Sequence, residues 1–245
     1  MDVLRDPTVM FCIWVVLAPI GLMVLENQHS FGEVVQQSLQ GYLLSPTLLC
    51  SYAYLFLVVS LAHSGGRTVK LSPRDQRVAR WFLMNGVYFN LFLDVVSGQF
   101  QANSLMTYQY NLIEPRYKFG PMDVRGQSVF WTSMCELFFQ SPFCILVYYG
   151  YVRGKAWRRC LEVIVSVLHI AGVWWFYVPE AYSNFPHLGG WPADWKEALT
   201  FHRVFYFYFG FWFMAAVWVT TAFMIGKTAF MEIADIIQAS KTHSE

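Results

Sequence analysis

Two carboxylates stand inside long apolar runs of the sequence: Asp94 in residues 79–98 and Glu136 in residues 128–152. A charged side chain at membrane depth costs about 2.5–3.5 kcal/mol, so such residues normally face the protein interior and serve a function. A carboxylic acid held neutral near pH 7 can donate a proton, and a neighbouring carboxylate can accept one. Two acids in one apolar cavity could therefore protonate an alkene or epoxide and deprotonate the resulting cation. Alternatively, intramembrane acids join helices, bind an ion or pair with a buried histidine.

Neighbours at helical spacing extend this candidate site. Asn90 lies four residues before Asp94, and Gln140 lies four residues after Glu136, so each pair shares a helix face. His169 lies well inside another apolar run, where it could orient an acid or hold a proton. A lone histidine among apolar residues is more often structural. We take Glu136, Asp94, Asn90 and His169 as the candidate catalytic residues.

Aromatic residues dominate the last apolar run, residues 203–226. Their π faces attract cations, so a cavity lined by them can stabilise a carbocation without quenching it. Ordinary packing and anchoring at the membrane interface account for most of these side chains. We predict that the following residues contact a substrate: Trp218, Trp175, Gln140, Tyr208 and Phe211.

The elements that must position these residues are transmembrane helices. The sequence is 56% hydrophobic and only 13% charged, whereas soluble domains carry about 25% charged residues. The alternation typical of barrel strands is absent, which leaves an all-α helix bundle. We predict a single polytopic domain of about six spans, with an additional span at the N-terminus and a tail over residues 227–245. The predicted spans are residues 8–25, 42–62, 79–98, 128–152, 161–178 and 203–226.

Lysines and arginines gather in the segments that would lie on one side of such a bundle, including residues 63–80 and 153–160. The positive-inside rule then predicts that both termini face the cytosol. The five cysteines fit neither a disulfide framework nor a zinc site, and no cofactor-binding motif is present. We expect no metal, no cofactor and no nucleic acid. The expected partners are a hydrophobic isoprenoid or sterol and membrane lipid, and a homodimer remains open.

From residue 79 onward, short segments resemble the EXPERA group, which includes the emopamil-binding sterol Δ8–Δ7 isomerases and the sigma-2 receptor. Residues 90–94, Asn-Leu-Phe-Leu-Asp, resemble the acid-bearing helix of that group. Residues 134–143 resemble the sigma-2 pattern of a glutamate, a glutamine four positions on, and Pro-Phe. Residues 165–180 and 205–218 are similar to later helices of the isomerases. The resemblance thus covers residues 79–226 and leaves the first span as an addition.

This resemblance implies a membrane-buried cavity for sterols or cationic amphiphiles, usually in the endoplasmic reticulum. In the isomerases two acids and a histidine move protons across a sterol double bond. By position, Asp94 and Glu136 match the two acids, and Trp218 matches a tryptophan of the cavity. Asn90 replaces the isomerase histidine, Ala215 replaces an asparagine, and Asp94 is one methylene shorter than the isomerase glutamate.

These departures favour a terpenoid cyclase over a sterol Δ8–Δ7 isomerase. The expected function is protonation of a double bond or epoxide of an isoprenoid lipid, followed by rearrangement or ring closure and deprotonation. Two alternatives remain open. One is a non-enzymatic sterol-binding or trafficking protein of the sigma-2 type, and the other is a structural partner of another membrane protein.

Overall fold

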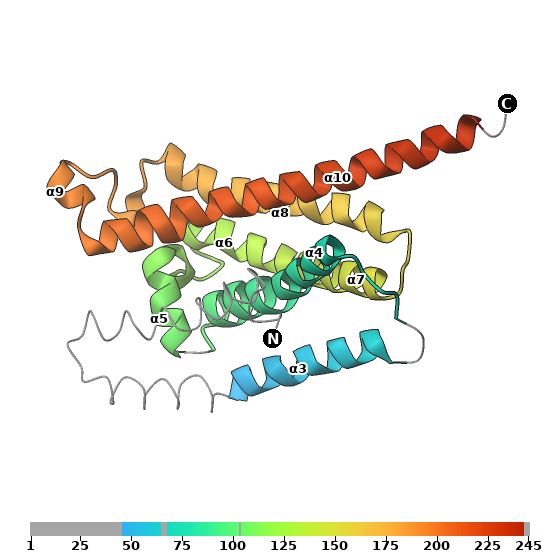
Figure 1. Ribbon diagram of the computed structural model, residues 1–245. Helices are drawn as coiled ribbons and strands as arrows, with labels where there is room; N and C mark the ends of the chain where they lie inside the picture. Colours follow the sequence, from blue (N-terminus) through green and yellow to red (C-terminus); the bar gives the residue numbers. More distant parts are fainter. Residues whose placement is uncertain (1–45, 65–67, 103, 243–245) are drawn as a thin grey trace.

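The computed structural model describes residues 46–64, 68–102 and 104–242 (Figure 1). These residues form helices and connecting segments without a strand, which confirms the predicted all-α class. The predicted span over residues 8–25 and the start of the second span lie outside the described residues. The elements are α3 (Pro46–His63), α4 (Pro73–Met84), η3 (Asn85–Gln99), α5 (Ser104–Ile113), η4 (Pro115–Lys118), α6 (Val124–Cys135), η5 (Glu136–Gln140), α7 (Ser141–Val152), α8 (Arg158–Tyr182), η6 (Pro186–Leu188), α9 (Trp195–Ala198), η7 (Arg203–Phe213) and α10 (Met214–Thr242).

Within the described residues, three continuous helices are long and apolar enough to cross a membrane: Val124–Val152, Arg158–Tyr182 and Arg203–Lys241. They correspond to the last three predicted spans. The predicted span over residues 79–98 is helical, in α4 and η3, but is not one of the three. Its polar residues lower its hydropathy and turn inward, since Asn85, Asn90 and Ser97 are at most 2% exposed.

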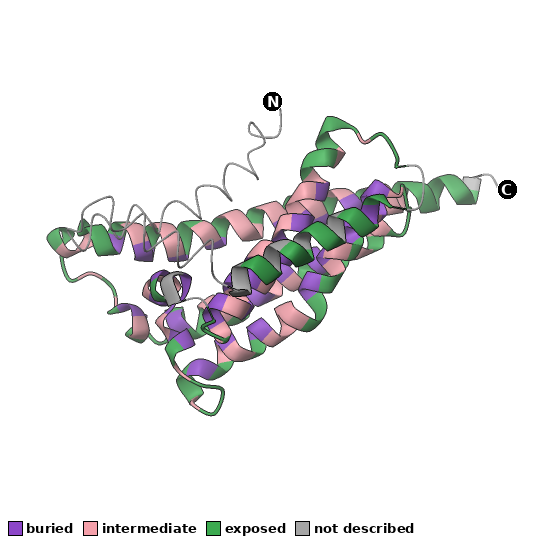
Figure 2. Ribbon diagram, turned by 90° about the horizontal axis from the view of Figure 1, so that it is seen from below, coloured by how far each residue is buried: buried purple, intermediate pink, exposed green. Residues whose placement is uncertain are grey.

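Helix α8 and the rod formed by η7 and α10 lie side by side (Figure 1). Their close approach depends on Gly226, where an added Cβ would lie 2.7 Å from the Cβ of Ser166. Helices α6 and α7 pack against α8, and α4 and η3 pack against α7. Figure 2 shows the buried residues where the helices face one another and exposed residues along the far end of α10. That end continues beyond the bundle as one straight helix to Thr242.

Local sequence explains where these helices begin and where their turns widen. Helix α4 begins at Pro73, and the Ser72 hydroxyl caps it by accepting a hydrogen bond from the Asp75 amide. The π-helical segment η5 ends where the Ser141 amide bonds the Glu136 carbonyl five residues back. Pro142 follows and has no amide hydrogen with which to continue the regular α-helical pattern. Such π turns recur at functional sites, and η3 and η7 are π-helical as well.

Candidate active site in the helix bundle

A cavity of about 230 Å³ lies between η3, α5, the α6–η5 helix, α8 and the η7–α10 rod. Its wall is predominantly apolar and aromatic, with a small number of polar side chains. All four predicted catalytic residues line it: Asp94 and Asn90 from η3, Glu136 from η5, and His169 from α8. Gln140 also lines it. Residues far apart in the sequence are thus brought to one cavity.

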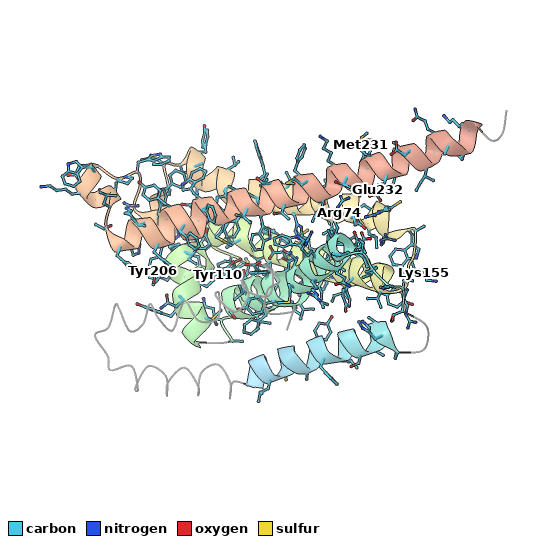
Figure 3. All side chains as sticks on the ribbon, in the orientation of Figure 1. Arg74, Tyr110, Lys155, Tyr206, Met231 and Glu232 are labelled. Carbon is cyan, nitrogen blue, oxygen red and sulfur yellow. The ribbon has the colours of Figure 1, made fainter. Side chains whose placement is uncertain are left out.

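Asp94 is held by a residue that the sequence analysis did not identify. The hydroxyl of Tyr110, on α5, donates a hydrogen bond to Asp94 Oδ1. Figure 3 shows the side chains of Tyr110 and Tyr206 where α5 approaches η7. These two elements are joined by the Tyr206 hydroxyl, which donates to Gln109 Oε1 at 2.9 Å. The helix α5, which lies between two predicted spans, therefore forms a wall of the cavity.

Glu136 has a different environment from Asp94. Its Oε2 atom is buried and has no hydrogen-bond partner among the described residues. The two acids are close enough for their charges to interact. Asp94 therefore accepts a hydrogen bond from a hydroxyl group, whereas Glu136 Oε2 lies at the same cavity without a hydrogen-bond donor among the described residues.

Gln140 ties together three helices that line the cavity. Asn90 Nδ2 donates to Gln140 Oε1 at 3.5 Å, and Gln140 Nε2 donates to the carbonyl of Leu168 at 3.4 Å. Gly172 leaves room for this amide, because an added Cβ there would lie 3.3 Å from Gln140 Nε2. In this structure Gln140 fixes η3 and η5 against α8, in addition to lining the cavity.

His169 is buried at the cavity wall, with 4% of its surface exposed. Its Nε2 atom has no hydrogen-bond partner among the described residues. The structure therefore brings His169 to the same space as the two acids without showing this nitrogen bonded to either.

Trp218 lines the cavity from α10. Its ring packs edge-on against Phe89, with ring centroids 4.8 Å apart, and against Trp81 at 5.2 Å. The position of this indole is thus fixed by two other aromatic side chains.

Three of the residues predicted to contact a substrate do not line the cavity: Trp175, Tyr208 and Phe211. Trp175, on α8, is 52% exposed. Tyr208 is 37% exposed. Phe211 is fully buried behind the cavity wall, where its ring lies 4.1 Å from that of Tyr177, measured between centroids. Helical phase places all three on other faces of their helices.

A buried ion network includes one residue of the cavity wall, Glu114. Glu114, which lines the cavity, accepts hydrogen bonds from Arg116 Nε at 2.6 Å and Nη2 at 2.7 Å. Arg116 also donates to the carbonyl of Phe176 at 2.6 Å and lies 3.5 Å from Glu180 Oε1. His187 Nδ1 lies 2.6 Å from the same Glu180 oxygen. Burial raises the pKa of Glu114, although the hydrogen bonds and charge of Arg116 act in the opposite direction.

Residues 122–227 match the EXPERA family, the expanded EBP superfamily. This part of the chain is therefore similar to the EXPERA superfamily. The EXPERA region runs from the turn before α6 into α10, and so contains Glu136, Gln140, His169 and Trp218. Asp94 and Tyr110 lie before it. No curated protein and no solved structure matches the chain.

The EXPERA match and the three long apolar helices together show an integral membrane protein. The family contains both sterol isomerase-like and sigma-receptor-like proteins. Among the described residues, no group of three histidine, cysteine or acidic side chains is placed to hold a metal ion. The chemistry open to the cavity is therefore argued from its acids, amides and aromatic rings.

Proposed function

We propose that this protein is a membrane-embedded isomerase or cyclase that acts on an isoprenoid lipid by acid–base chemistry. The observation that supports this proposal is the meeting of Asp94 and Glu136, from separate helices, at one apolar cavity. Burying an unpaired charge is costly, so two such acids at one site need a reason. Proton transfer to and from a hydrocarbon guest supplies that reason.

The different environments of the two acids suggest their roles. Glu136 Oε2 has no partner among the described residues, and a neutral, protonated acid is the form that an apolar wall accommodates most easily. Asp94 accepts a hydrogen bond from Tyr110, which favours a carboxylate. We therefore assign Glu136 as the proton donor and Asp94 as the proton acceptor.

The reaction then proceeds in three steps. Glu136 transfers its proton to an alkene carbon or an epoxide oxygen, and the π bond or the C–O bond breaks to leave a carbocation. A hydride or alkyl shift, or attack by a second double bond that forms a C–C bond, moves the cation. Asp94 removes a proton from the adjacent carbon, whose C–H electrons form the new double bond. Transfer of that proton back to Glu136 restores the starting state, so protons balance over the cycle.

Aromatic rings would stabilise the cation between these steps. Trp218, Phe89, Tyr206 and Phe209 all line the cavity. Aromatic faces attract a cation within about 6 Å of the ring centre and, unlike a carboxylate, do not combine with it. Ring closure needs such a lining, because water or a stray nucleophile would capture the cation early.

We propose a terpenoid substrate in preference to a Δ8 sterol. Asn90 and Ala215 both line the cavity at the positions where the resembling isomerases carry a histidine and an asparagine. Asn90 is bonded to Gln140. With those two isomerase groups replaced, we favour ring closure of a prenylated epoxide or alkene. We further propose location in the endoplasmic reticulum with both termini in the cytosol, which cysteine labelling of intact microsomes would test.

The decisive experiment is incubation of the purified protein with a panel of Δ8 sterols, prenylated alkenes and prenylated epoxides in deuterated buffer. Products are identified by mass spectrometry and NMR. We expect Glu136→Gln to abolish turnover while the protein stays folded, and Cys135→Ser, one residue away but not at the cavity, to retain it. Protonation at carbon should leave one solvent deuterium in the product. A fully active Glu136→Gln variant would show that Glu136 is not the proton donor.

A second candidate is a non-catalytic receptor for sterols or cationic amphiphiles. The bare Glu136 oxygen in an aromatic cavity favours it, because a carboxylate there would pair with a ligand ammonium group. This function predicts binding without product for every member of the panel. It also predicts that Glu136→Gln weakens binding of amines far more than binding of neutral sterols.

A further inference from the structure

A second cavity, of about 380 Å³, lies at the other end of the bundle between α4, α7, the start of α8 and α10. Its lining combines the guanidinium groups of Arg74, Arg77 and Arg159 with the apolar side chains of Val78, Trp81, Met224 and Ile225. The cavity is thus amphipathic. It is separate from the one that holds the two acids, although Trp81 packs against Trp218 of that first cavity.

The acidic residues of this second cavity are already paired. Arg159 lies 2.8 Å from Glu162 and 4.0 Å from Asp75, the two acids of the lining. It also reaches Glu232 of α10 at 2.5 Å. These contacts join α4, α8 and α10 around the cavity, and Figure 3 shows Arg74 and Glu232 at this end of the bundle.

Arg74 and Arg77 differ from Arg159. Both are exposed at the start of α4. Neither has an ion-pair partner among the described residues. Guanidinium groups bind phosphate oxygens in a bidentate manner, so a pair of them on one helix turn suits a phosphate group.

The position of the cavity relative to the membrane indicates where that phosphate belongs. The α10 residues that line it, Thr221 to Thr228, lie about 30 Å along the helical rod that starts at Arg203, which is the thickness of the hydrocarbon layer. With Arg203 at one edge of the hydrocarbon layer, the cavity would lie at the opposite membrane interface. Met224 lines it and is 63% exposed, so the apolar lining opens laterally toward the lipid.

We infer that this cavity binds the phosphate group of an anionic membrane lipid, with Arg74 and Arg77 as its ligands and an acyl chain along Met224. The lipid comes from the leaflet at the basic end of the bundle, which the positive-inside rule places on the cytosolic side. A soluble phosphate shares the same headgroup chemistry but makes no use of the apolar lining. The inference is independent of the reaction proposed for the first cavity.

Native mass spectrometry of the full chain in detergent tests this inference, with short-chain phosphatidylglycerol, phosphatidylcholine and inorganic phosphate as probes. The test variant is R74Q/R77Q. The matched control is K70Q/K155Q. It also removes two positive charges from this end of the helix bundle, but at exposed residues that do not line the cavity. A third variant, R74K/R77K, keeps the charge. Thermal unfolding of each variant checks that its fold is intact.

We expect phosphatidylglycerol to bind more tightly than phosphatidylcholine. R74Q/R77Q should weaken phosphatidylglycerol binding about tenfold or more, the effect of losing charge-assisted contacts of roughly 1.4 kcal/mol in total. K70Q/K155Q should change it less than threefold, and R74K/R77K should retain part of the affinity. Equal losses in the two glutamine variants would show diffuse surface attraction and overturn the inference. Complete displacement of the lipid by inorganic phosphate would assign the site to a soluble anion and overturn it as well.

Discussion

The hydroxyl of Tyr110 donates a hydrogen bond to the carboxylate of Asp94, although the two residues belong to different helices. This contact gives one of the two cavity acids a fixed orientation and an environment that the other acid lacks. Proton transfer requires a defined direction between donor, guest and acceptor. The pairing of a tyrosine with only one acid therefore provides the asymmetry that such a cycle needs.

Replacing Tyr110 with phenylalanine should lower turnover by about 10–100-fold, because a hydrogen bond to a charged group contributes roughly 1.5–3 kcal/mol. Substrate affinity should change much less, since the apolar ring stays in place. Initial-rate kinetics on the substrate found in the panel would measure both. An unchanged turnover number would show that Asp94 works without this contact.

Replacing Trp218 with alanine should lower turnover and release prematurely deprotonated or water-quenched products. This change opens a void beside Phe89 and Trp81, and truncation of a packed aromatic residue costs about 3 kcal/mol or more. Product profiles and the melting temperature would be recorded together. Trp175→Ala is the matched control, because Trp175 does not line the cavity; a similar product change in that variant would contradict the site described above.

Replacing Arg116 with methionine should destabilise the protein by about 3–5 kcal/mol, because it leaves the buried carboxylates of Glu114 and Glu180 without their shared cation. Thermal unfolding in detergent would show the loss as a clearly lower melting temperature. Adding Glu114→Gln to this variant should restore part of the stability. A melting temperature equal to that of the unchanged protein would mean that the network does not stabilise the fold.

Acidification should loosen the segment between α8 and η7. Glu197 accepts hydrogen bonds from the Ala193 amide at 2.8 Å and from Arg203 at 2.5 Å, and the amide contact, followed by that with Arg203, lowers its pKa below 4.5. Because the folded state favours the carboxylate, its stabilising effect is present above pH 4.5 and is lost as pH falls below that value.

Hydrogen exchange in residues 186–199 would report this change. Arg203 also binds the carbonyls of Leu188, Gly189 and Gly190, so the exchange should rise across the whole segment in acid. Glu197→Gln should show the faster exchange already at pH 7 and respond little to acid. A variant with the same pH response as the unchanged protein would rule out Glu197 as the responsible group.

The convergence of Asp94 and Glu136 could be predicted because the cost of placing a charge in oil forces both side chains inward. Four-residue spacing then placed Asn90 and Gln140 beside them, and the structure has all four at one cavity. The last three spans followed from length and hydropathy alone. Whether these residues catalyse a reaction remains a prediction.

The errors have two physical origins. Tyr110, Glu114 and Arg116 were overlooked because α5 and η4 are too short and polar to read as a span, and Pro115 signals a turn. Their roles depend on tertiary packing, which no local pattern encodes. Tyr208 and Phe211 were misplaced because they lie in η7, whose wider π turns change the helical phase relative to Trp218.

The straight continuation of α10 beyond the bundle has a practical consequence. The rod that starts at Arg203 ends at Thr242 without interruption, so its outer end is rigidly connected to the wall that carries Trp218. A rigid helical protein spliced in frame at residue 242 should inherit a fixed orientation. It would serve as an alignment marker for electron cryomicroscopy of a chain of only 28.5 kDa.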